Sequence, residues 1–364
     1  MATAEETRKA PSSIIRHTDR EAWDQLAAGL GAQPFQAWAW GELKGQFGWQ
    51  PHRLSAPDGK SGAQVLIRPF RGLSVAYVPR GPFPSAAGPM DPALLEQIVR
   101  LARSRRAAFL RFEPDVLHAD AKAADLDSFL KQQGFRTAER TLGQRSSIRL
   151  DLAPSEDELF GSFSKGHRAD VKRAERSGVT VRVGTAESEV DGLHRMLIAT
   201  TERKAFEYHT AAYYRALWRF FGDAARLYLA ELNGEVVAAS LVLAWGDNGL
   251  YLFAGSTRAG LDNRAGHLLQ WHAIRWAKER GAKTWDLWGI ADARGRIEMA
   301  RRQGVAADSP ELMMLEDEAS RDPKSGLERF KKGWGGYVVR SVPAYDRVFI
   351  TPAYWLWTRR RGEA

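Results

Sequence analysis

The same order of expected elements occurs twice along the chain, and this repeat limits the possible folds more than any other feature. In the first half, three strands, a helix and a further strand are expected at residues 49–54, 63–68, 74–78, 92–106 and 108–113. In the second half the same order is expected at residues 226–232, 236–245, 250–254, 264–280 and 283–288. A turn signal follows the first strand of each half, and its glycines, Gly59 and Gly234, are 175 residues apart. Glu113 and Trp288, which end the last strands, are also 175 residues apart, so the pattern indicates a duplicated unit.

An antiparallel meander, then a helix, then a returning strand is the order of elements in the acetyltransferase-like GNAT fold. We therefore expect an α/β protein with mixed α+β sheets, built from two tandem GNAT-like domains. Ser155 and Glu158 fit a capping box that begins a new helix, which places the boundary near residue 154. The expected domains are residues 1–153 and 154–342, and the C-terminal segment, about 343–364, is expected to pack back on the first.

The composition is that of a folded protein, and it excludes several kinds of chemistry. Of 364 residues, 44% are hydrophobic and 27% are charged, and there is no cysteine. Disulfides, thiolate zinc sites and a cysteine nucleophile are therefore excluded. Residues 1–15 lack the apolar core of a signal peptide, and the longest strongly apolar uncharged stretch, 236–246, is too short to span a membrane. We expect a cytoplasmic protein.

Positive charge is concentrated in two segments of the chain. The formal net charge is +9, while residues 165–182 carry +4 and residues 324–364 carry +6. On a helix, Lys165, Arg168, Lys172 and Arg176 share one face. A single charged face is commonly only solvated, but two basic clusters also suit a polyanionic partner. Both interpretations remain open at this point.

Motifs from about Phe35 to Tyr345 resemble those of the Fem-type (FemABX) aminoacyltransferases, which build the interpeptide bridge of bacterial peptidoglycan. In chain order these motifs cover residues 36–44, 48–49, 80–82, 167–174, 177–179, 200–206, 213–214, 251–256, 268–271, 286–290 and 330–336. Nothing between Ser155 and Phe206 is long enough for the helical-arm insert of some members. The chain thus resembles the compact form.

The resemblance implies a tRNA-dependent aminoacyltransferase. Such an enzyme moves an amino acid of the glycine, alanine or serine class from aminoacyl-tRNA to the stem-peptide amine of a peptidoglycan precursor, either UDP-MurNAc-pentapeptide or lipid II. Aminoacyl-tRNA is then the co-substrate, and no other cofactor is implied. Phosphates on both substrates suit the basic segments. The expected location is cytoplasmic, with peripheral contact at the inner membrane face as an option, and no stable protein partner is expected.

The resemblance also implies roles for individual residues. Lys331 is expected to be catalytic, by stabilising negative charge near the ester. Phe330, Lys332, Arg168 and Lys172 are expected to bind tRNA. The acceptor is expected to be bound by Lys44, Thr201, Arg203, Tyr208 and Tyr251. Read without the resemblance, Lys331 is a lysine at a helix C-terminus, Tyr251 is a core aromatic residue and Lys44 is a surface lysine.

The proton acceptor for the attacking amine is not assigned by the sequence. Glu113 and Asp115 follow an expected strand, but carboxylates there commonly serve a turn, and the substrate's own groups could take the proton. The eight histidines include no pair at metal-ligand spacing with nearby carboxylates, so no metal is expected.

Two other functions remain as alternatives. An acyl-CoA-dependent N-acyltransferase would share the fold, although residues 262–267 lack the close glycines that hold a pyrophosphate at a helix N-terminus. A non-catalytic protein that binds RNA or a membrane surface is the second, because residues 354–361 place aromatic residues beside arginines. A final strand or helix packed on the first domain, followed by a frayed arginine tail, explains that segment slightly better.

Overall fold

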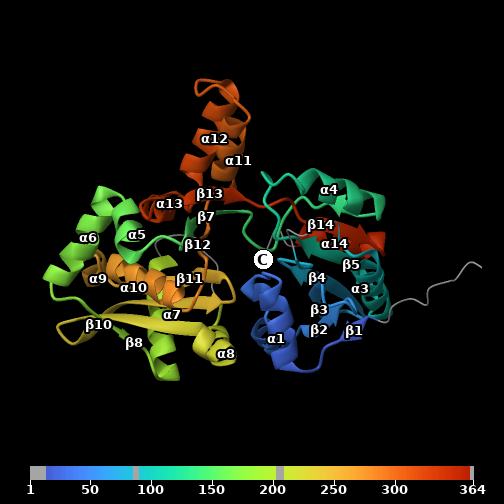
Figure 1. Ribbon diagram of the computed structural model, residues 1–364, viewed down its shortest axis with the longest axis horizontal. Helices are drawn as coiled ribbons and strands as arrows, with labels where there is room; N and C mark the ends of the chain where they lie inside the picture. Colours follow the sequence, from blue (N-terminus) through green and yellow to red (C-terminus); the bar gives the residue numbers. More distant parts are fainter. Residues whose placement is uncertain (1–13, 85–89, 202–208, 361–364) are drawn as a thin grey trace, which may run out of the picture. The chain divides into compact units, whose positions relative to one another are not determined.

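The computed structural model describes residues 14–84, 90–201 and 209–360, and the chain divides into two compact units (Figure 1). The first unit comprises described residues up to Val116, Ala121–Arg140 and the segment from Pro343. The second comprises Leu117–Asp120 and Thr141–Val342. Both units are built around a mixed sheet, which confirms the expected fold class.

Among the described residues, the first unit contains a seven-stranded sheet in the order β1-β2-β3-β4-β5-β14-β6. The strands are β1 (Ile15–Arg16), β2 (Gln50–Ser55), β3 (Gly62–Phe70), β4 (Leu73–Pro79), β5 (Ala107–Glu113), β6 (Arg136–Thr137) and β14 (Tyr345–Val348). Its helices are α1 (Arg20–Gly29), α2 (Trp38–Gln46), α3 (Pro92–Ser104), α4 (Ala123–Gln132) and α14 (Thr351–Arg360), with a 3-10 turn η1 (Pro34–Gln36). The apolar face of α3, with Leu94, Leu95 and Ile98, is buried, as its helical spacing requires.

The described part of the second unit contains a seven-stranded sheet in the order β13-β7-β12-β11-β10-β9-β8. The strands are β7 (Ser146–Asp151), β8 (Thr180–Val183), β9 (Ala225–Leu232), β10 (Glu235–Trp245), β11 (Asn248–Ser256), β12 (Thr284–Gly289) and β13 (Tyr337–Arg340). The helices before β11 are α5 (Glu156–Ser162), α6 (Lys165–Arg176), α7 (Glu187–Thr201) and α8 (Ala211–Phe221), with η2 (Gly222–Ala224). Those after it are α9 (Arg258–Asp262), α10 (Ala265–Glu279), α11 (Asp292–Arg302), α12 (Pro310–Arg321) and α13 (Ser325–Lys332).

The two sheets repeat one plan. Read from β1 and from β8, each begins with antiparallel strands and then has a parallel pair, β4 with β5 and β11 with β12. A further strand then pairs with the second strand of this parallel pair and runs antiparallel to it. In the first sheet this strand is β14, beside β5, and in the second it is β7, beside β12. This repeated order explains the offset of 175 residues in the sequence.

Strand β7 corrects the expected domain boundary. The sequence predicts that residues 1–153 belong to the first domain, but β7 pairs with β12 and β13 of the second sheet. The corresponding place in the first sheet is filled by β14, from the C-terminal segment, which pairs with β5 and β6. Each sheet thus contains a strand that its sequence neighbours would assign to the other unit. The capping box of Ser155 and Glu158 is present, but it begins α5 within the second unit.

Candidate active site

Helix α13 carries Lys331 into the interior of the second unit. The side chain is 3% exposed, and its Nζ donates to the carbonyl oxygens of Trp288, at 3.1 Å, and Gly289, at 2.7 Å. These acceptors belong to the end of β12, not to α13 itself, so Lys331 does not act as a simple helix C-terminal cap. An ammonium has three N–H donors, and the third has no partner among the described residues.

An irregular end of β12 presents these two carbonyls. The pairing of β12 with β7 shifts register between Asp286 and Gly289, and Trp288 has a φ of 63°, in the left-handed region. The Trp288 N–H donates to Asp286 Oδ1 at 2.8 Å, which fixes this turn of the backbone. Asp286 Oδ2 in turn accepts from Arg149 Nε at 3.0 Å and Ser147 Oγ at 3.2 Å. The carbonyl pair is therefore held by a buried polar network.

Burial is the dominant electrostatic effect on Lys331. Desolvation lowers its pKa to about 7, Asp286 acts in the opposite direction, and Lys324 lowers the pKa further. Near neutral pH both the ammonium and the amine form of the group are therefore populated. A buried lysine with such a pKa is a candidate for functional chemistry.

Phe330, the neighbour of Lys331 on α13, lines a cavity of about 320 Å³ in the second unit. The lining also includes Ser240 from β10, Tyr251 from β11 and His267 from α10. The rings of Tyr251 and His267 lie 6.3 and 5.0 Å from that of Phe330. Burial raises the pKa of Tyr251, so its hydroxyl stays protonated. The Ser240 hydroxyl is buried without a hydrogen-bond partner among the described residues. The cavity is thus mainly apolar with a few polar groups, as small-molecule sites are.

His167 on α6 connects the basic helix to the Phe330 segment, which the sequence did not suggest. Its Nε2 lies 2.7 Å from the Phe330 carbonyl oxygen and its Nδ1 lies 3.1 Å from Ser164 Oγ. A Cβ atom at Gly333 would overlap the imidazole, so this glycine permits the contact. Burial lowers the pKa of His167, and it lowers the pKa of His267, 4.8 Å away between ring centroids, to about 4. The sequence signals were the motif 167–174, which begins at His167, and Gly333 in the 330–336 motif, and neither identifies the other as its partner.

The residues predicted to bind tRNA have different surroundings in the structure. Lys332 is half exposed and its Nζ forms an ion pair with Glu328 at 2.6 Å. Lys172 is exposed, with its Nζ 5.9 Å from the Phe160 ring centroid. Arg168 instead donates to the carbonyl oxygens of Gly161 and Phe163 at the end of α5. Its guanidinium therefore braces the backbone as well as adding positive charge.

The predicted acceptor residues lie in both units. Tyr251 lies in the cavity beside Phe330, whereas Lys44 is a half-buried residue of α2 in the first unit, with its Nζ 5.1 Å from the Trp40 ring centroid. Thr201 is the last residue of α7. Arg203 and Tyr208 lie outside the described residues. The described residues thus bring together Tyr251 and Phe330 of the predicted set, and Lys331 is the next residue after Phe330 on α13.

Glu113 and Asp115 are both held by neighbours in the first unit. The Tyr77 hydroxyl donates to Glu113 Oε2 at 2.7 Å, and Gln33 Nε2 donates to Asp115 Oδ2 at 2.8 Å. Glu113 is also buried. These contacts fit structural roles for the two carboxylates.

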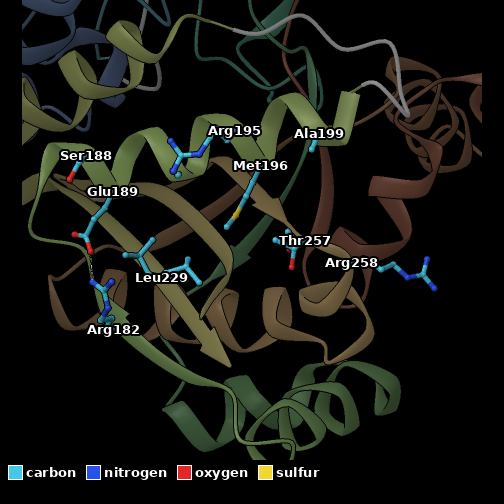
Figure 2. Close-up of a pocket in the computed structure, with 12 residues that line it drawn as sticks. Arg182, Ser188, Glu189, Arg195, Met196, Ala199, Leu229, Thr257 and Arg258 are labelled. Atoms are coloured by element: carbon cyan, nitrogen blue, oxygen red, sulfur yellow. Dashed lines mark ion pairs between the residues drawn. The ribbon is translucent and has the colours of Figure 1, made fainter. Parts of the chain in front are cut away.

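A larger cavity, of about 690 Å³, lies under α7 in the second unit (Figure 2). Figure 2 shows Met196 and Leu229 pointing toward each other within it and the ion pair between Arg182 and Glu189 at one end. None of the predicted site residues lines this cavity. Within the described ranges, no group of three or more acidic or histidine side chains is placed to hold a metal ion. No helix in those ranges combines the length and apolar character needed to cross a membrane.

Comparison with known proteins gives matches along most of the chain. The FemAB family model matches residues 31–235, and a model of the acetyltransferase (GNAT) domain matches residues 161–334. A UDP-N-acetylmuramoylpentapeptide-lysine N(6)-alanyltransferase from Weissella viridescens is 25% identical over 301 residues, covering 76% of this chain and 87% of the relative. A lipid II:glycine glycyltransferase from Staphylococcus haemolyticus is 21% identical over 400 residues, covering 87% of this chain and 88% of the relative.

Solved structures share the fold. The crystal structure of FemX superposes with a TM-score of 0.78 at 19% identity, over 94% of this chain and 99% of FemX. L-PGS from Bacillus licheniformis has a TM-score of 0.53 at 15% identity, over 95% of this chain and 97% of that one. Because the FemAB family model covers more than half of the sequence, the chain belongs to the FemAB family, and it is an aminoacyltransferase.

Proposed function

We propose that the protein transfers an amino acid of the glycine, alanine or serine class from aminoacyl-tRNA to the stem-peptide amine of a peptidoglycan precursor. The acceptor is UDP-MurNAc-pentapeptide or lipid II, and the product belongs to an interpeptide bridge of the cell wall. The names of the two relatives support the acceptor and the type of reaction. The observation that carries the proposal is the buried lysine Lys331, whose neighbour in the chain, Phe330, lines the cavity.

The reaction needs no covalent enzyme intermediate. The neutral stem-peptide amine attacks the ester carbonyl, a C–N bond forms, and the carbonyl oxygen becomes an oxyanion. The C–O bond to the tRNA 3′ end then breaks, and the proton lost by the amine ends on the released hydroxyl. Since the donor ester is already activated, a chain without cysteine can catalyse this aminolysis.

We assign to Lys331 the stabilisation of the oxyanion. In the ammonium form, two of its N–H groups donate to the carbonyl oxygens of Trp288 and Gly289. These two bonds fix the direction of the third N–H group, which is left to donate to the oxyanion. Low local dielectric strengthens the attraction between a buried ammonium and a developing oxyanion. The same burial that lowers the pKa of Lys331 therefore supports this role, provided that the group is protonated in the reacting complex.

We assign binding of the tRNA 3′ end to the cavity that Phe330 lines and to the basic helix α6. Bases at single-stranded ends stack on aromatic rings, and Phe330 offers one beside the cavity. Lys165, Lys172 and Arg176 are exposed on α6 and supply charge for phosphates. Lys332 adds to this charge, while Arg168 acts mainly by bracing the end of α5.

We assign binding of the acceptor to five residues: Lys44, Thr201, Arg203, Tyr208 and Tyr251. The shared cavity of Tyr251 and Phe330 supports the proposal that acceptor and donor ends meet there. Because Glu113 and Asp115 are engaged by Tyr77 and Gln33, we assign neither as the base, and a substrate group is proposed to take the proton. The location proposed is the cytoplasm.

The segment between β11 and α10 weighs against an acyl-CoA donor. It contains the short helix α9 and Arg264 in a left-handed conformation, in place of a glycine-rich loop that could hold a pyrophosphate. The same cavity at this end of the sheet is lined by Phe330 and His267.

The test is a reconstituted transfer reaction. Purified protein is incubated with charged tRNA and with UDP-MurNAc-pentapeptide or lipid II, and the acceptor is examined by mass spectrometry. We expect the mass of one or more amino-acid residues to be added, and we expect ribonuclease treatment of the tRNA to abolish the addition. Modification that proceeds with acyl-CoA in the absence of tRNA would refute the proposal.

A further inference from the structure

Three apolar side chains are exposed around the C-terminal helix of the first unit. Phe70, Trp355 and Leu356 are 38%, 54% and 42% exposed. Trp355 and Leu356 lie on the outer side of α14, because Tyr354 is buried and its ring packs 5.1 Å from Phe109. Trp357 connects the two parts of this surface, with its ring 6.0 Å from Phe70 and 5.9 Å from Phe109. The inner side of α14 thus anchors a helix whose outer side is apolar.

Arginines surround these apolar residues. Arg71 lies in the β3–β4 turn, Arg103 and Arg106 lie at the α3–β5 turn, and Arg359 lies on α14, and all four are exposed. The Ser74 N–H donates to the Arg106 carbonyl at 3.0 Å, which joins the two turns. None of the four forms an ion pair with a described carboxylate. We name Phe70, Arg71, Arg103, Arg106, Trp355, Leu356 and Arg359 the α14 surface.

Aromatic rings hold several of these guanidinium groups. Arg71 lies 5.4 Å from the Phe70 ring centroid, Arg359 lies 5.3 Å from Trp355, and Arg103 lies 4.9 Å from Phe349 at the entrance to α14. Positive charge and apolar area are therefore interleaved on this surface. Such alternation is typical of segments that lie at the boundary between lipid headgroups and acyl chains.

Two of the arginines have a left-handed backbone conformation. Arg71 and Arg106 have φ values of 46° and 55°, a region where glycine or asparagine is favoured. Turn geometry alone would select those smaller residues. Asparagine at both positions would therefore remove the charge without straining either turn.

We propose that the α14 surface binds an anionic membrane, with Trp355 and Leu356 in the acyl boundary and the arginines on lipid phosphates. A nucleic acid would also attract the arginines, but it would leave Leu356 and Phe70 without an apolar environment. A lipid surface satisfies both kinds of side chain. For a lipid-linked acceptor this contact brings the enzyme to its substrate, a consequence that rests on the proposed function.

Vesicle flotation with the full-length protein tests the proposal. Vesicles containing about one-third phosphatidylglycerol in phosphatidylcholine are compared with pure phosphatidylcholine at about 0.15 M salt. We expect the wild type to float with the anionic vesicles only. The variant Trp355→Ser/Leu356→Ser is expected to weaken this partitioning by roughly tenfold or more. Arg71→Asn/Arg106→Asn is expected to weaken it as well, and asparagine suits the left-handed turns, so the fold is retained.

Met313→Ser/Met314→Ser is the matched control, since these side chains are 62% and 73% exposed on α12 of the other unit. It is expected to float like the wild type. The proposal is overturned if the wild type does not float with anionic vesicles, or if the Trp355/Leu356 variant floats equally well. It is also overturned if the variants lose affinity for tRNA instead of for vesicles. Transfer to the soluble UDP-linked acceptor without lipid is measured in parallel, so a failure of the proposed function is seen separately.

Discussion

The Nζ of Lys331 lies 2.7 Å from the carbonyl oxygen of Gly289, so a buried ammonium joins α13 to the end of β12. Lys331, whose pKa is lowered by burial to about 7, directly follows Phe330 in the chain, and Phe330 lines a cavity together with Tyr251. Asp286 partly offsets the effect of desolvation on the pKa of Lys331. It also fixes the backbone that supplies the Trp288 and Gly289 carbonyls. Geometry and charge at this position are therefore set by one network.

The buried lysine predicts a specific dependence of stability on pH. Burial lowers the pKa of Lys331 from 10.5 to about 7, so between these values the unfolded chain binds a proton that the folded chain does not. The free energy of unfolding contributed by this group therefore rises with pH across that window, by at most about 1.4 kcal/mol per pH unit. Lys331→Met lacks this contribution. We expect the wild type to gain stability relative to the variant from about pH 7 to 10.5, as measured by urea unfolding. Parallel stability curves would contradict the assigned burial.

The contact of His167 with Gly333 predicts an energetic coupling. Gly333 has ordinary helical backbone angles, so Gly333→Ala acts only through the clash of its Cβ with the imidazole. Overpacking of this kind costs about 1–3 kcal/mol. In the double variant with His167→Ala the ring is absent, and we expect the destabilisation to be smaller than the sum of the single effects by about 0.5 kcal/mol or more. Chemical denaturation of the four proteins gives the coupling, and additive effects would show that the two residues do not meet.

The ion pair between Arg111 and Asp346 predicts that the C-terminal segment stabilises the first unit. Arg111 on β5 donates two hydrogen bonds, of 2.7 and 2.6 Å, to an Asp346 carboxylate on β14 that is fully buried. Removal of one partner of such a pair costs about 3–5 kcal/mol. Asp346→Ala is therefore expected to unfold the first unit at markedly lower denaturant concentration. Asp317→Ala is the control, because its pair with Arg321 is exposed, and it should change stability by less than about 0.5 kcal/mol. Equal effects of the two substitutions would be inconsistent with this packing.

Local sequence signals predicted most elements of the duplicated units. The helix expected at 92–106 is α3 (Pro92–Ser104), and the strand expected at 236–245 is β10 (Glu235–Trp245). Periodicity and turn residues act within a few positions, so they fix such elements well. They do not say which sheet a strand joins. The pairing of β7 within the second sheet therefore escaped prediction, because it depends on residues far apart in the chain, whereas the C-terminal segment that carries β14 was expected to return to the first domain.

The candidate site was predictable in its residues but not in its contacts. The motif around Phe330 and Lys331 indicated the position, yet the carbonyl acceptors depend on the left-handed Trp288, which no local pattern announces. His167 was visible only as part of a basic segment. Its contact with the Phe330 carbonyl appears once α6 and α13 pack together. For Arg168 the predicted role and the observed contacts differ. It was expected to bind tRNA, but its guanidinium donates to a backbone carbonyl of its own unit.

The central claim is that Lys331 stabilises the transition state of aminoacyl transfer, and a paired substitution tests it most directly. Single-turnover transfer from charged tRNA and tRNA affinity are measured for Lys331→Met and for its neighbour variant Lys332→Met. We expect Lys331→Met to slow transfer by about 10²-fold or more with tRNA affinity little changed, as for loss of an oxyanion donor. Lys332→Met is expected to weaken tRNA binding while transfer at saturating tRNA is maintained. Transfer by Lys331→Met at the wild-type rate, or equal losses of binding and turnover, would contradict the role assigned to Lys331.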